Sequence, residues 1–164
     1  MIGVSVLDDL VTEILNNYGR GRILIAVDGP EAGATGAFAD ALAAALRERD
    51  RTVFRAAAQT TGVSDAEAGR VRDVLTRFRG GAAADGSDVP DDALLVVDGR
   101  FLLQLRLRGS WHFRIWLEGG PELSPDAYAE RARYVRDDAP RGAADAIYDV
   151  TDADAPRRVW SDSC

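Results

Sequence analysis

The sequence predicts an α/β domain built on a parallel sheet, on the strength of three observations. Short and nearly continuous apolar runs at residues 23–27, 93–97 and 113–117 are typical of strands buried on both faces. These runs alternate with segments of helical periodicity, which indicates strand–helix–strand units. The length of 164 residues, 46% of them hydrophobic and 29% charged, suits a single domain spanning residues 1–164.

The first expected element is an amphipathic helix over residues 5–18, within an N-terminal extension of residues 1–19 that precedes the sheet. Its apolar residues recur at helical spacing, and Ser5 with Asp8 resembles a capping box. The first strand then covers residues 23–27. A glycine-rich loop, residues 28–36, follows it and leads into a helix over residues 37–49.

The alternation continues to the end of the chain. Ser64 is expected to cap a helix that ends at Gly80, and Pro125 occupies the favoured first turn of another helix, which reaches about Val135. The small, acidic stretch at residues 80–92 is predicted to be a mobile loop. The remaining strands are expected at residues 52–57, 93–97, 113–117 and 146–150, with a further edge strand at 157–160.

Composition excludes several classes of function. The net charge of −7 argues against a nucleic-acid partner, because such binding depends on basic side chains that neutralise phosphates. The only cysteine is Cys164, so no disulfide within the chain and no cysteine-based metal site is expected. No apolar run approaches a membrane span and no leader is recognised, so we expect a cytoplasmic protein without a membrane partner. The sequence does not decide the oligomeric state, and a homodimer is one possibility.

The glycine-rich loop is the first candidate site. A phosphate loop reads G-x-x-x-x-G-K-[ST]; counted from Gly29, Ala34 takes the second glycine, Thr35 the lysine and Gly36 the hydroxyl residue. In a loop shortened by one residue, Gly33 is the second glycine and Thr35 is left to touch a metal. Neither register supplies the lysine. The alternative is a tight turn whose glycines serve packing alone.

The wider sequence resembles the uridine kinase family of P-loop phosphotransferases. The stretch "RILIAVDGPEAGATGAFADALAAAL" is similar to that family's strand, loop and helix, and "ALLVVDGRFLL" and "LRGSWHFRIWLE" are similar to later segments. The resemblance covers most of residues 22–159. It implies a P-loop NTPase-like three-layer α/β/α fold with five parallel strands in the order 2-3-1-4-5. It also implies ATP and Mg²⁺ as ligands, and Gly29, Gly33, Ala34, Thr35 and Gly36 as the phosphate-binding residues.

The departures from the family concern its chemistry. The chain contains no lysine at all, so none can be supplied from elsewhere in the fold. Gln59 and Thr60 stand where the family has an acid that activates the acceptor, and the region after residue 118 is short for its arginine-bearing lid. Arg131, Arg133 and Arg136 could act there, but an exposed helix face is the favoured interpretation. Loss of one such electrostatic group typically costs about 10²–10³ in rate.

Asp98 is the candidate catalytic residue, either as a carboxylate that positions magnesium or as a turn residue before Gly99. Asp28 and Glu31 add negative charge near the loop, although backbone N–H groups at the helix start could still bind an anion weakly. We favour a kinase-like protein with a defective loop that binds a nucleotide or another small anion. An active nucleoside kinase and a structural module with a vestigial crevice are the alternatives.

Overall fold

The computed structural model describes residues 1–160 and contains one six-stranded sheet in the order β2-β3-β1-β4-β5-β6. The first five strands are parallel and β6 runs antiparallel to β5, which confirms the predicted order and the added edge strand. The strands are β1 (Ile23–Asp28), β2 (Val53–Ala57), β3 (Leu94–Gly99), β4 (Phe113–Glu118), β5 (Ala146–Asp149) and β6 (Arg157–Val159).

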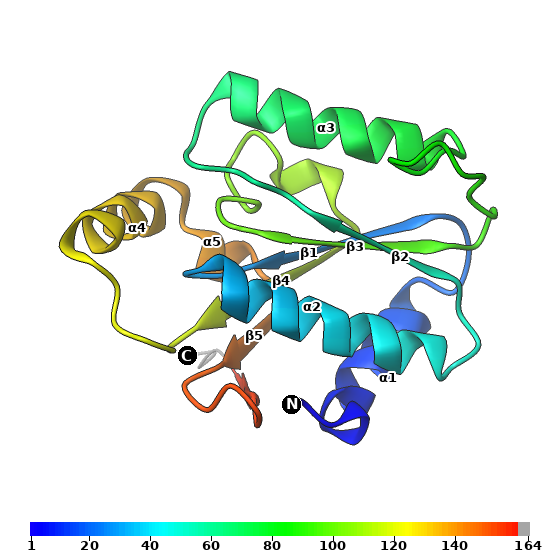
Figure 1. The fold of residues 1–164 in the computed structure, drawn as a ribbon, viewed down its shortest axis with the longest axis horizontal. Helices are drawn as coiled ribbons and strands as arrows, with labels where there is room; N and C mark the ends of the chain where they lie inside the picture. Colours follow the sequence, from blue (N-terminus) through cyan, green and yellow to red (C-terminus); the bar gives the residue numbers. More distant parts are fainter. Residues whose placement is uncertain (161–164) are drawn as a thin grey trace.

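Helices cover both faces of this sheet, which makes the three layers visible in Figure 1. The 3-10 helix η1 (Val4–Leu7) leads into α1 (Asp8–Asn17), and these lie with α2 (Ala32–Arg47) on one side of the sheet. On the other side lies α3 (Asp65–Arg79). The remaining helical elements are η2 (Arg108–Ser110), α4 (Pro125–Asp138) and α5 (Pro140–Ala143).

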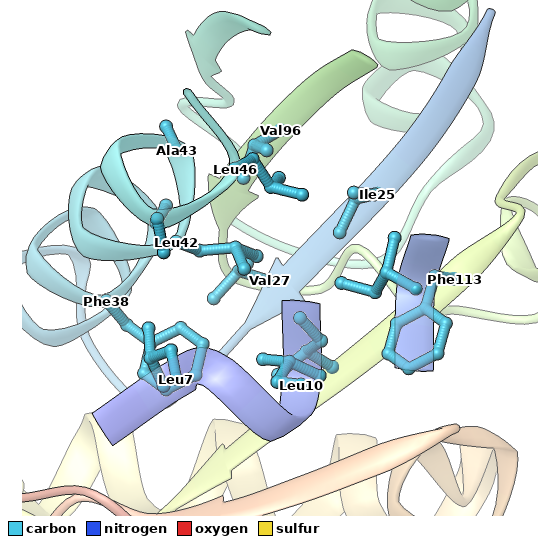
Figure 2. Close-up of a cluster of buried hydrophobic side chains, with 14 of the residues drawn as sticks. Leu7, Leu10, Ile25, Val27, Phe38, Leu42, Ala43, Leu46, Val96 and Phe113 are labelled. Atoms are coloured by element: carbon cyan, nitrogen blue, oxygen red, sulfur yellow. The ribbon is translucent and has the colours of Figure 1, made fainter. Parts of the chain in front are cut away.

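Two apolar cores fill the spaces between the layers. Side chains alternate along β1, so that Ile25 and Val27 face α1 and α2 while Leu24 and Ala26 face α3. Figure 2 shows the first core, in which Phe38 and Leu42 of α2 lie beside strand residues and beside Leu7 and Leu10. The N-terminal helix thus completes the cover over β1 and β4.

Helix caps follow the sequence in part. The Ser64 hydroxyl accepts a hydrogen bond from Glu67 N–H (3.1 Å) and α3 ends before Gly80; Ser124 and Pro125 begin α4, all as predicted. The capping box expected at Ser5 is wrong. A 3-10 turn occupies that position and no side chain caps it or the start of α1.

Residues 80–92 form a compact turn with an antiparallel bridge between Ala82 and Asp88. Arg22 fixes one side of it, because its guanidinium donates to the carbonyl oxygens of Val89 (2.9 Å) and Arg79 (2.9 Å). Mobility of this segment stays a prediction. Within residues 1–160, no helix combines the length and apolar character that a membrane crossing requires.

Candidate functional site

The connection between β1 and α2 is shorter than the sequence predicted. Only Gly29, Pro30 and Glu31 link Asp28 to Ala32, the first residue of α2. The expected loop of residues 28–36 and the helix start at residue 37 are therefore wrong. Residues 32–36 form the first turns of the helix, because alanines favour helix and Glu31 supplies the cap.

Glu31 places a carboxylate at the N-terminus of α2. Its Oε1 accepts a hydrogen bond from Ala34 N–H (2.7 Å), and its two carboxylate oxygens would each lie 3.2 Å from a Cβ at Gly33. This is the end of a helix at which free N–H groups and the helix dipole attract anions. The backbone anion site expected there is thus covered by a carboxylate of the protein itself.

Gly29 is required by close packing. A Cβ at this position would lie 2.7 Å from Thr35 Cγ2 and 3.2 Å from Leu117 Cβ, so α2 and β4 approach the backbone directly. Thr35 is fully buried, and its hydroxyl donates to Ala32 O (3.1 Å). The glycine and threonine of the predicted phosphate-binding set therefore have a packing role in this geometry.

Asp98 lies close to this turn, as the alignment of strand ends predicts. It pairs with Val27 across β1 and β3, and Oδ2 lies 3.5 Å from Thr35 Oγ1 and 3.6 Å from a Cβ at Gly36. The structure therefore brings Thr35, Gly36 and Asp98 together at the carboxyl edge of the sheet. The Asp98 side chain is 6% exposed, which makes an unpaired negative charge there costly.

Arg55 of β2 supplies the opposite charge, and sequence reasoning missed it. Its Nη2 lies 2.7 Å from Asp98 Oδ1, its Nε donates to Asp40 Oδ1 (3.0 Å), and its Nη1 donates to Val96 O (2.8 Å). The feature of the sequence that could have indicated this ion pair is an arginine within a predicted strand. The guanidinium holds one oxygen of Asp98, so a metal ion would have to compete with an existing ion pair.

Asp28 ends β1 as a fully buried carboxyl. Its Oδ2 accepts hydrogen bonds from the Tyr134 hydroxyl (2.6 Å) and from Leu103 N–H (3.1 Å), while Oδ1 has no partner in residues 1–160. Burial raises the pKa of Asp28 from 3.8 to about 6, against the opposing effects of Tyr134, Leu103 and Arg131. This link ties α4 to the end of the central strand.

Arg131 does not lie on an exposed helix face, contrary to the prediction. Its guanidinium lies 4.2 Å from the centroid of the Trp116 ring and donates to Leu117 O (3.0 Å). Arg131 and Arg100 also line a small recess beside Asp28, Gly29 and Pro30. The exposed face was predicted correctly for Arg133 and Arg136.

An open pocket of about 500 Å³ lies between the start of α2 and the ends of β2 and β3. Gln59 and Thr60 line it, as the strand ends predicted, together with Arg55, Asp98 and Arg100. Asp65, the next carboxylate along the chain, does not line it and instead pairs with Arg106.

These residues do not fit a magnesium nucleotide as a working phosphate loop holds it. The chain offers no lysine, a carboxylate caps the helix, and Arg55 occupies Asp98. No group of three His, Cys, Asp or Glu side chains within residues 1–160 is arranged to hold a metal ion. Arg100 and Gln59, which also line the pocket, carry N–H groups that could instead donate hydrogen bonds to a ligand there.

The fold is a three-layer α/β domain whose strand order, β2-β3-β1-β4-β5-β6, matches a P-loop NTPase-like architecture. No model of a protein family matches the chain, and no curated protein matches its sequence. Among solved structures it is similar to a possible uridine kinase from Bacillus stearothermophilus. That match has a TM-score of 0.68 at 16% identity and covers 87% of this chain and 97% of the other.

A second solved structure is similar, that of a "putative fructose transport system kinase" from Silicibacter sp. TM1040. Its TM-score is 0.57 at 16% identity, covering 87% of this chain and 88% of the other. At this level of identity the two likenesses establish a kinase-like fold. Function has to be argued from the site itself.

Proposed function

We propose that this chain is a kinase-fold protein that binds a nucleotide or another small anion without transferring phosphate at the rates of working kinases. The observation that carries the proposal is the Glu31 carboxylate, which caps α2 at the end where a phosphate loop holds its anion. Phosphoryl transfer depends mainly on positioning and on positive charge around the phosphates. The first turn of α2 offers neither.

Binding has support on the other side of the crevice. The pocket of about 500 Å³ has not been filled by side chains, which favours a ligand over a purely structural role. Arg100 lines both this pocket and the recess at Gly29 and Pro30, and it forms no ion pair within the described residues. An anion at this edge of the sheet would therefore meet the Arg100 guanidinium, which lies over the Phe101 ring at 5.4 Å.

An active kinase with an aberrant loop is the second candidate, because Arg100 and Arg131 flank the connection between β1 and α2. Two arginines could stabilise part of the charge that the loop lysine normally stabilises. Arg131 is already engaged by Trp116 and Leu117 O, so its contribution would require α4 to move.

The deciding experiment combines calorimetric titration of ATP, with and without Mg²⁺, with transfer of radiolabelled phosphate to uridine. We expect ATP binding that Arg100→Gln weakens and the exposed Arg133→Gln leaves unchanged, with no transfer. Turnover of roughly 1–100 per second would establish the second candidate. No binding of ATP or inorganic phosphate, to the native chain or to either variant, would refute both.

A further inference from the structure

A second pocket lies between β2 and α3 and adjoins the pocket at Asp98 along residues 57–60. It has a volume of about 490 Å³, within the range of about 300–1,000 Å³ that small-molecule sites occupy. Its walls are apolar side chains of both layers, including Ala56, Val71 and Val74. The space exists because Ala56 of β2 and Ala58, which directly follows the strand, are the small residues on this face, where larger side chains would reach α3.

Charged and polar side chains stand at one end of this apolar pocket. Glu67 and Arg70, one turn apart on α3, line it together with Gln59. Their side chains form an ion pair of 2.8 Å, with Glu67 13% and Arg70 67% exposed. The pocket therefore combines an apolar interior with one negative and one positive group side by side.

The Glu67 carboxylate does not form the hydrogen bond that its position in the first turn of α3 would allow. Ser64 and Glu67 have the spacing of a capping box, in which the glutamate would accept a bond from Ser64 N–H. Only the serine half is formed. Glu67 Oε1 instead accepts from the Thr61 hydroxyl (2.9 Å) and contacts Arg70, and Oε2 is buried with no partner in residues 1–160.

Such a buried acceptor without a donor lowers stability unless something supplies the missing bond. The Thr61 hydroxyl, followed by Arg70, holds the pKa of Glu67 below its ordinary value, so the carboxylate is ionised at neutral pH. The last torsion of a glutamate side chain is soft, so either oxygen can turn toward a ligand.

We propose that this pocket binds an apolar α-amino acid in its zwitterionic form. The ligand's ammonium group donates to the Glu67 carboxylate, its carboxylate accepts from the Arg70 guanidinium, and its side chain enters the space beside Val71 and Val74. The arrangement of one negative group, one positive group and an apolar wall complements the three parts of such a ligand. This pocket shares Ala57, Ala58, Gln59 and Thr60 with the pocket at Asp98, but the charged residues that line the two are different. Variants of Glu67 therefore test this proposal separately from the Arg100 variant that tests the proposed function.

The test is calorimetric titration of the full chain with L-leucine and L-phenylalanine at millimolar concentration. Two analogues of leucine each lack one charge: isopentylamine has no carboxylate and 4-methylpentanoate has no ammonium group. We expect saturable binding of at least one amino acid, and binding of each analogue weaker by roughly tenfold or more, since one charge-assisted contact is lost. The proposal is overturned if neither amino acid binds saturably, or if both analogues bind as tightly as leucine.

Variants separate recognition from general effects on the fold. Glu67→Gln should weaken amino-acid binding by roughly tenfold, whereas Asp73→Asn, an equal change of charge on the exposed side of α3, should not. Ala56→Leu fills the pocket and should abolish binding, with the exposed Ala66→Leu as its control. Circular dichroism verifies folding. If Ala56→Leu does not fold, the two charge variants still decide the outcome, and equal affinities for them refute the proposal.

Discussion

Removal of the Glu31 carboxylate should weaken the start of α2 and expose it to anions. In Glu31→Ala, the Ala34 N–H loses its acceptor at 2.7 Å, and the helix loses a negative charge at its positive end. Loss of an N-cap costs about 1 kcal/mol in free energy of unfolding, within a range of about 0.5–2 kcal/mol. For a domain of this size, 1 kcal/mol lowers the melting temperature by about 2–4 °C.

The same substitution should create a response to phosphate. With the carboxylate gone, phosphate can bind the freed N–H groups, and at ten times its Kd it would stabilise the fold by about 1.4 kcal/mol. The assay is urea unfolding of the native chain and the variant, each with and without phosphate at constant ionic strength. The expected result is a variant that is less stable in buffer and gains more from phosphate than the native chain does.

Glu48→Ala provides the matched control. Glu48 caps the other end of α2 and is exposed, so its removal deletes the same charge where a negative group is unfavourable. This control should unfold at the native denaturant concentration or slightly above it. If Glu31→Ala behaves like Glu48→Ala in both buffers, Glu31 neither caps the helix nor covers an anion site, and the reasoning is refuted.

Three further perturbations follow from buried groups. Asp28→Asn should keep both hydrogen bonds that Oδ2 accepts, because the amide oxygen can take its place. The raised pKa of Asp28 means that the folded native chain binds a proton between pH 3.8 and about 6 that the unfolded chain does not, so its free energy of unfolding should fall by about 3 kcal/mol relative to the variant as pH rises through that window. An equal pH dependence of the free energy of unfolding in both proteins, measured with urea, would contradict this. Arg55→Met should cost about 3–5 kcal/mol because it strands the Asp98 carboxylate, and adding Asp98→Asn should recover part of the loss in a double-mutant cycle measured by urea unfolding. The triple variant Ala34→Gly, Thr35→Lys and Gly36→Thr restores the residues of a phosphate loop. Its melting temperature should be below that of the native chain because position 35 is buried, but ATP with Mg²⁺ should raise it. If ATP does not raise the melting temperature, the packing interpretation of the turn is favoured.

The sequence was sufficient to predict the strands and, with the family resemblance, their order. Continuous apolar runs can be buried only in the central sheet, between two layers of helices. The run at residues 93–97 became β3 with only small changes at its ends, and the edge strand at residues 157–159 formed as expected. The start of α2 was missed for a local reason. Glycines at positions 33 and 36 suggested a loop, but Glu31 caps the segment and the alanines at positions 32, 34 and 37 favour helix.

The charged partners could not have been predicted from linear distance. Arg55 meets Asp98 only because β2 and β3 are neighbours in register, whereas the cations predicted from the sequence were the arginines at positions 131, 133 and 136. Arg131 was assigned to an exposed face because α4 is rich in charge. Its position over Trp116 depends on how α4 packs against β4, which helical periodicity does not encode.

The central place of β1 also constrains the order in which the protein can fold during synthesis. Ile25 has Val96 and Phe113 as its two partners, and both leave the ribosome long after it. Until then the nascent chain carries a strand of five apolar residues and Asp28 whose backbone groups are unpaired on both sides. The early helices η1, α1 and α2 can shield one face of it but neither edge. A chain that stalls before residue 113 would therefore present a template for aggregation, and its fate would depend on chaperones rather than on its own core.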